Sequence, residues 1–120
     1  MMQTKAMIVD DNIRMAEVLA EMLEVFHLET ITVQDGETAL RSLNEEPISL
    51  VITDLRMPKM TGVELLRSIK AQNPDVSVVV ISGYDLSADD DQYVREIAQG
   101  FLRKPFKMEQ IRDLLASIGS

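Results

Sequence analysis

The chain has 120 residues, a length that suits one compact domain with an ordinary hydrophobic core. It has no cysteine, which excludes disulfides and thiolate sites, and its net charge of −8 makes direct nucleic-acid binding by this chain unexpected, because phosphate backbones repel it. No apolar run approaches the ~20 residues of a membrane span and no signal peptide opens the chain, so a cytoplasmic protein without a membrane segment is expected.

Short apolar runs alternate with helical patterns along the chain. The runs are rich in Val, Ile and Leu, as strands buried on both faces are, and the stretches between them repeat apolar residues at helical spacing. Expected strands cover residues 6–9, 30–33, 50–53, 76–81 and 101–102. Expected helices cover residues 13–26, 37–43, about 63–72, a short stretch to about 98, and 108–118. Asn12 is placed to cap the first helix, and an acidic stretch from Asp85 to Asp91 precedes the fourth.

Strands that alternate with helices favour a parallel sheet with right-handed crossovers and with helices on both faces. The predicted class is therefore α/β, with about five strand–helix units. The sequence has no linker, repeat or low-complexity tract long enough to divide it, so residues 1–120 are expected to form a single domain. In such sheets, ligands bind outside the carboxyl ends of the strands, where the strand order reverses.

Four of the five expected strands end at a side chain that can take part in chemistry. Asp10 and Asp11 follow the first strand, Asp54 the third, Ser82 the fourth and Lys104 the fifth. Three carboxylates in one crevice repel one another unless a cation neutralises them. Mg²⁺ suits such a crevice because it prefers hard oxygen ligands and completes its shell with water and phosphate oxygens. A nucleophile, a cation site, a lysine and a hydroxyl together are what phosphoryl transfer requires.

Each of these residues also has an ordinary structural explanation when it is taken alone. Acids such as Asp10 and Asp11 suit the start of a helix, and Asp54 suits the turn after a strand. Lys104 before a proline and Ser82 before a glycine are common in surface loops. Their joint placement at strand ends is what favours a reaction centre.

Four segments resemble the signature segments of response-regulator receiver domains, in the same order. They are residues 9–12, 53–62, 81–84 and 101–106, and the second contains Asp-x-x-Met-Pro-x-x-x-Gly from Asp54 onward. The resemblance covers essentially the whole chain and implies a flavodoxin-like, doubly wound, five-stranded parallel sheet of order 2-1-3-4-5. It also implies a domain of two-component signalling that is similar to chemotaxis regulators.

The resemblance implies a phosphoacceptor and a metal site. Asp54 would accept a phosphoryl group from a phosphohistidine on a sensor histidine kinase or a histidine phosphotransfer protein. Mg²⁺ would be held by Asp10 or Asp11, by Asp54 and by the backbone carbonyl of Arg56, and would neutralise charge on the transferring group. Such a domain catalyses its own phosphorylation and slow dephosphorylation and is not a turnover enzyme.

Three further residues are implied to stabilise the phosphoryl group or to respond to it. Lys104 would pair with its oxygens, aimed into the crevice by a cis bond to Pro105, and Ser82 would hydrogen-bond the attached group. Phe101 would then turn from exposed to buried. The output face would consist of the fourth helix, the fifth strand and the fifth helix, and would act on an unidentified downstream target. A monomer or weak dimer is expected.

Some positions depart from the family pattern or have ordinary explanations. Ile97 stands where receivers often have a glycine that ends the fourth helix in the left-handed conformation. The consecutive acids at residues 89–91 add negative charge beside the output face, and they also suit a solvated helix start. His27, the only histidine, suits a solvated turn better than a ligand position.

Three other functions are compatible with this fold class. A flavodoxin would place a phosphate-binding loop after the first strand, where this chain has Asp10 and Asp11. A phosphohydrolase of the haloacid dehalogenase kind would need an acid where Arg56 stands. A degenerate receiver that binds partners without phosphorylation would not need the full set of acceptor, metal ligands and lysine, and it is the main alternative to a phosphoacceptor.

Overall fold

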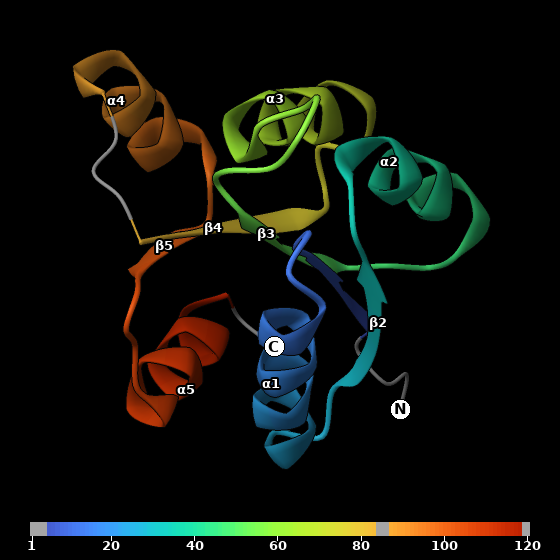
Figure 1. Cartoon of the computed structure of the whole chain (residues 1–120), viewed down its shortest axis with the longest axis vertical. Coiled ribbons are helices and arrows are strands. Elements are labelled where there is room, and N and C mark those ends of the chain that lie inside the picture. Colours follow the sequence, from blue (N-terminus) through green and yellow to red (C-terminus); the bar gives the residue numbers. More distant parts are fainter. Residues whose placement is uncertain (1–4, 84–86, 119–120) are drawn as a thin grey trace.

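The computed structural model describes residues 5–83 and 87–118, in which five parallel strands alternate with five helices (Figure 1). The strands are β1 (Lys5–Val9), β2 (Glu29–Val33), β3 (Leu50–Asp54), β4 (Ser77–Ser82) and β5 (Gly100–Arg103). The helices are α1 (Ile13–Val25), α2 (Gly36–Glu45), α3 (Gly62–Gln72), α4 (Ala88–Ile97) and α5 (Met108–Ser117). The sheet order is β2-β1-β3-β4-β5, which confirms the predicted topology.

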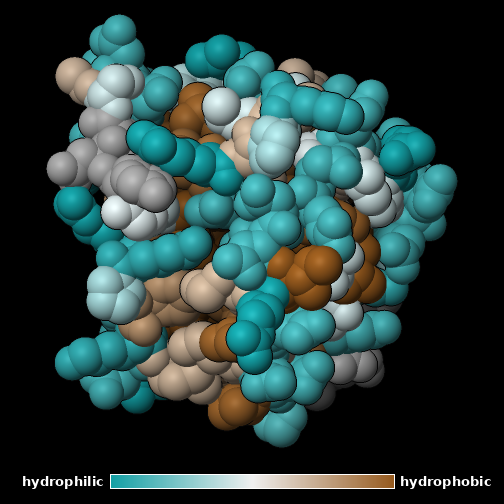
Figure 2. Space-filling view, in the orientation of Figure 1, coloured by the Kyte–Doolittle hydropathy of each residue, from teal (hydrophilic) through white to brown (hydrophobic). Residues whose placement is uncertain are grey.

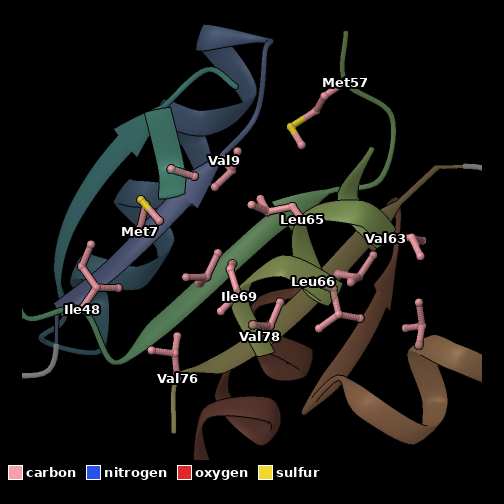
Figure 3. Packing of buried hydrophobic residues seen from close by; sticks show 14 residues of the cluster. Met7, Val9, Ile48, Met57, Val63, Leu65, Leu66, Ile69, Val76 and Val78 are labelled. Carbon is pink, nitrogen blue, oxygen red and sulfur yellow. The ribbon is translucent and has the colours of Figure 1, made fainter. Parts of the chain in front are cut away.

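The helices form two layers, with α1 and α5 on one face of the sheet and α2, α3 and α4 on the other (Figure 1). Successive strand residues point to opposite faces, so a strand such as β1 contributes alternately to two cores. Met7 and Val9 join the core under α2, α3 and α4, called here the α2–α4 core, part of which is drawn in Figure 3. Ala6 and Ile8 join the second, called here the α1–α5 core. This arrangement explains why the sequence of β1 is apolar throughout.

Polar residues begin four of the helices, as their sequences favour. The Asn12 side chain accepts a hydrogen bond from the Met15 amide at 3.2 Å, which confirms its predicted capping of α1. Asp35 and Ser87 cap α2 and α4 in the same way, and Thr61 forms a capping box at α3. These caps fix where each helix starts relative to the strand before it.

The start and end of α4 differ from the sequence-based expectation. The helix begins at Ala88, so the acids at 89–91 lie in its first turn instead of preceding it. Carboxylates there complement the exposed amides and the helix dipole, which explains the early start. The helix ends at Ile97, and Ala98 follows in an extended conformation with φ −77° and ψ 150°. Neither Ile97 nor Ala98 adopts the left-handed conformation, so the glycine that receivers often have at the place of Ile97 is not required here.

Other positions named from the sequence are ordinary surface or loop positions. His27 is exposed in the turn after α1, with a left-handed φ of 65°. Tyr84 and Asp85 lie outside the described residues.

Among the described helices, none combines the length and apolar character needed to cross a bilayer. Hydrophilic side chains cover most of the face seen in Figure 2, and hydrophobic ones show between them, several in the lower half where α1 and α5 lie.

Candidate functional site

Three carboxylates meet at the carboxyl ends of β1 and β3. These strands are neighbours, and Val9 pairs with Thr53, so the residues that follow, Asp10 and Asp54, emerge side by side. Together with Asp11, each offers a carboxylate oxygen, and these oxygens all lie within 4.8 Å of one another. Asp10 is buried, Asp54 is partly buried and Asp11 is exposed. The cluster is open to solvent on one side and closed by protein on the other.

Lys104 supplies a positive charge to this cluster. Its Nζ lies 3.4 Å from Oδ1 of Asp54 and 4.0 Å from Oδ2 of Asp10. The lysine follows β5, two strands from β3, and its backbone amide donates to the Ser82 carbonyl at 2.8 Å, which aligns it beside the end of β4. The Lys104–Pro105 bond is cis, as the resemblance implied. The Lys104 ammonium group thus lies beside two of the three carboxylates of the cluster.

The surroundings of Asp10 in this cluster change the pKa of its carboxyl. Burial raises the pKa of this carboxyl above its ordinary value, and the nearby charges of Asp54 and Asp11 raise it further. The Asn12 amide, which donates to Oδ1 at 2.9 Å, and the ammonium group of Lys104 oppose this rise in pKa. A divalent cation would relieve the remaining repulsion. Oxygen donors at this spacing match the hard ligand set that Mg²⁺ prefers.

The other residues predicted for the site lie at different depths. Ser82 is fully buried at the end of β4, next to the strand that carries Asp54. Phe101 is half-buried in the edge strand β5, where it pairs with Val80 and packs against the α2–α4 core. Arg56 is exposed in the loop between β3 and α3, two residues beyond Asp54. The structure therefore gathers the acids and the lysine at one point, with Ser82 one strand away.

Backbone hydrogen bonds hold the loop from β3 to α3 against the end of the sheet. The Leu55 amide donates to the Ile81 carbonyl at 2.9 Å, and the Gly62 amide returns to the Leu55 carbonyl at 2.8 Å. A Cβ on Gly62 would lie 2.4 Å from the Asp54 carbonyl oxygen, so only glycine allows this close approach. Met57 in the same loop is buried in the α2–α4 core (Figure 3). The backbone on both sides of Arg56 is thereby anchored.

Comparison with known proteins identifies the family. The family model for the response regulator receiver domain matches residues 6–116, nearly the whole chain. The chain belongs to the response-regulator receiver family. Receivers are signalling domains of two-component systems that take phosphoryl groups from histidine kinases, and they are not enzymes in the usual sense.

Individual relatives are similar to nearly the whole of this chain. The chain is 33% identical to the response regulator protein FleR of Pseudomonas aeruginosa. The match covers 96% of this chain but only 24% of the length of FleR. The chain is 32% identical to the two-component response regulator ORR5 of Oryza sativa, covering 92% of this chain and 84% of ORR5. A crystal structure of a response regulator receiver protein from Pseudomonas putida superposes with a TM-score of 0.88 at 28% identity, over 97% of this chain and 98% of that one.

The sequence analysis missed an apolar surface of the receiver beside the acid cluster. A cavity of about 30 Å³ lies beside Asp10, Asp54 and Lys104, and its other walls are apolar side chains of α1, of the strands β1, β3 and β4, and of Phe106. The exposed large hydrophobic residues of the described chain all lie on α1: Ile13, Met15, Val18 and Val25. Met15, one of the residues that line the cavity, is 37% exposed.

A sequence signal for this surface existed. Met15, Val18, Met22 and Val25 follow a spacing of three and four residues, which makes a second apolar stripe next to the core-facing one. We call these four residues the α1 stripe. Periodicity shows that a stripe exists but does not show which side the sheet covers, so only the packed structure separates it from the core.

Proposed function

We propose that this receiver accepts a phosphoryl group on Asp54 in a reaction that requires Mg²⁺. The observation that carries the proposal is the position of the Asp54 carboxylate, 3.4 Å from the Lys104 ammonium group and within an acid cluster that can hold a cation. A carboxylate oxygen of Asp54 attacks phosphorus, a phosphorus–nitrogen bond to the donor histidine breaks, and the imidazole leaves. The product is an aspartyl phosphate.

Four groups of the chain would hold the metal. They are the carboxylates of Asp10, Asp11 and Asp54 and the backbone carbonyl of Arg56. When bound, the ion neutralises negative charge on the transferring group and orients its oxygens. The protein contributes a preformed cluster, in which burial first, and then the charges of Asp54 and Asp11, raise the pKa of Asp10; both effects disfavour its charged form without a cation.

Lys104 and Ser82 would complete the binding of the phosphoryl group. Lys104 is placed to exchange its contact with Oδ1 of Asp54 for contacts with the phosphoryl oxygens. Ser82, fully buried at the end of the neighbouring strand, would donate its hydroxyl once the group is attached. That bond would draw the end of β4 toward Asp54.

The phosphoryl donor is proposed to be a sensor histidine kinase or a histidine phosphotransfer protein. A phosphohistidine can reach Asp54 only from the open side of the cluster, and the α1 stripe lies beside that opening. Its three-and-four spacing suits packing against an apolar stripe of a partner helix. We further propose that residues 1–120 act as a single receiver domain in the cytoplasm, as a monomer or weak dimer.

The output is proposed to pass through α4, β5 and α5, with Phe101 as the reporter. Phe101 is half-buried and Tyr93 of α4 packs on the same core, so inward movement of β4 would change both. If so, Phe101→Ala should be phosphorylated like the wild type but should lose the amide-exchange changes on α4 and α5 that beryllofluoride, a phosphoryl mimic, produces. Unaltered exchange changes in Phe101→Ala would contradict the switch role.

The decisive test of phosphorylation uses a small donor and intact-mass measurement. With Mg²⁺ and acetyl phosphate, the wild type should gain one acid-labile phosphoryl group, and EDTA should prevent the gain. Asp54→Asn should gain none, whereas Asp113→Asn, which changes an exposed acid on α5, should behave like the wild type. Equal labelling of Asp54→Asn would contradict the proposal, and no labelling of folded wild type would favour the degenerate, phosphorylation-independent receiver.

A further inference from the structure

The described residues contain three buried polar or charged side chains, and one of them has no role in the proposed reaction. Asp10 and Ser82 belong to the crevice, and the third, Thr53, lies directly before Asp54 and is completely buried. Because strand residues alternate in direction, Thr53 points away from Asp54, toward the face covered by α2, α3 and α4. Its hydroxyl therefore does not reach into the crevice.

The Thr53 hydroxyl forms a hydrogen bond with the backbone of Asp54, the proposed phosphoacceptor. Oγ1 donates to the carbonyl oxygen of Asp54 at 2.9 Å and lies 3.9 Å from Sδ of Met57. Packing alone does not explain a hydroxyl here, because valine has the same shape and avoids the cost of burying a polar group. The hydrogen bond to the Asp54 carbonyl offsets that cost and gives the hydroxyl a specific task.

We propose that Thr53 is a positioning residue that holds the peptide after Asp54 in the orientation needed for metal binding. Two successive carbonyls would then be fixed from inside the protein: that of Asp54 by Thr53, and that of Leu55 by the Gly62 amide at 2.8 Å. The next carbonyl, of Arg56, is the proposed backbone ligand of the metal. Peptide units are planar, so with these two fixed only φ and ψ of Arg56 turn its carbonyl, and the buried Met57 anchors the chain on the other side.

The close approach of α3 makes this arrangement sensitive to the hydroxyl. Gly62 packs so tightly that a Cβ there would lie 2.4 Å from the Asp54 carbonyl oxygen and 2.9 Å from Cα of Leu55. A rotation of the Asp54–Leu55 peptide would push its carbonyl against Gly62 or away from it, and would move Leu55 and Arg56 with it. Thr53 thus acts on the metal site through the backbone, without touching the ion. This inference rests on the proposed function.

The test compares Thr53→Val with Thr53→Ser, and both with Val51→Ala. Val51 is completely buried in the same strand and faces the same core, so Val51→Ala perturbs packing without removing a bond to the acceptor backbone. The dissociation constant for Mg²⁺ is measured by NMR titration of the full chain. Amide exchange at Leu55 and Met57 is measured without metal.

Thr53→Val should raise the Mg²⁺ dissociation constant about tenfold, the scale typical of groups that orient metal ligands, and should speed exchange at Leu55 and Met57. Thr53→Ser, which keeps the hydroxyl, should restore both values toward those of the wild type. Val51→Ala should lower the stability and leave the dissociation constant unchanged. A purely structural role of Thr53 predicts instead that Thr53→Val lowers stability alone.

Two results would overturn the inference by itself: a Thr53→Val protein with wild-type Mg²⁺ affinity and exchange, or a Val51→Ala protein whose affinity falls equally. In either case, a wild type that binds Mg²⁺ and is labelled on Asp54 would leave the proposed function intact. A folded wild type that neither binds Mg²⁺ nor accepts a phosphoryl group would overturn the proposed function and this inference together.

Discussion

In β1 and β3, a single peptide bond separates the apolar core from the acid crevice. Val9 is completely buried among apolar side chains, and the next residue, Asp10, is nearly as buried but carries a carboxylate. In the neighbouring strand the completely buried Thr53 is likewise followed by an acid, the partly buried Asp54. In the core every contact lowers the free energy of the fold, whereas in the crevice like charges are brought together against their repulsion.

The core and the crevice therefore contribute differently: the core to stability, the crevice to chemistry. Core side chains stabilise the scaffold that keeps β1 and β3 in register, and that register places the acids within 4.8 Å of one another. The crevice uses some of that stability to hold a charge arrangement that favours a cation and a phosphoryl group. Substitutions in the core should therefore change stability, and substitutions in the crevice should change chemistry with small or even favourable effects on stability.

The largest effect on stability is expected from the core. Leu66 of α3 is completely buried in the α2–α4 core, so Leu66→Ala should lower the free energy of unfolding by about 2–5 kcal/mol through lost burial and a cavity. Urea unfolding would measure this. Folded Leu66→Ala should still be phosphorylated. Loss of labelling in this folded variant would contradict the separation of core stability from crevice chemistry.

Lys104 offers the next test, on the side of the crevice. Lys104→Ala removes the ammonium group beside Asp54 and Asp10, and phosphoryl uptake from acetyl phosphate should slow by about 10- to 100-fold. Arg112→Ala removes an exposed positive charge from α5 and serves as the control for net charge. Equal rates for these two variants would mean that Lys104 does not act on the phosphoryl group.

Mg²⁺ should stabilise the unphosphorylated receiver by relieving repulsion among the acids. At ten times the dissociation constant, the expected gain is about 1.4 kcal/mol, seen as a rise in melting temperature. An Asp10→Ala, Asp11→Ala double variant should lose most of this rise. The matched control changes Asp89 and Asp90 in the first turn of α4 to Ala. A rise that survives in the first variant would place the ion elsewhere.

The smallest effect concerns the charge of Asp10. Its pKa is raised above the ordinary 3.8, so its favourable contribution to folding is present at low pH and is lost as pH rises through the raised pKa. Asp10→Asn should therefore be more stable than the wild type at pH 7, by no more than about 1 kcal/mol, because the Asn12 amide and the Lys104 ammonium group partly offset the cost of the buried charge. The difference should shrink as the pH falls.

Asp35 provides a control of opposite sign. The Thr38 amide, which donates to Oδ1 at 2.7 Å, holds the pKa of the Asp35 carboxyl below its ordinary value. Its contribution to stability is present above the ordinary pKa and is lost as pH falls through the lowered one. Asp35→Asn should be less stable than the wild type at pH 7. Finding both Asn variants shifted in the same direction would contradict the contrast between crevice and helix cap.

Much of the fold could be predicted from the sequence because its signals are local. The order of strands and helices follows from apolar periodicity, and the cap at Asn12 follows from a side chain three residues before the amide it binds. The position of acids directly after strands also follows from sequence order. The strand order came from the resemblance of four segments to receivers, since periodicity does not specify which strands are neighbours.

The placement of Asp10, Asp54 and Lys104 at the ends of strands in an α/β domain follows from the sequence, because runs of apolar residues and the polar residues after them are properties of the chain itself. The packed structure is needed to show that Lys104 lies 3.4 Å from Asp54 and that Met15, Val18 and Val25 of the α1 stripe stay exposed. These distances and exposures depend on which segments pack together, and that packing joins residues far apart in the sequence.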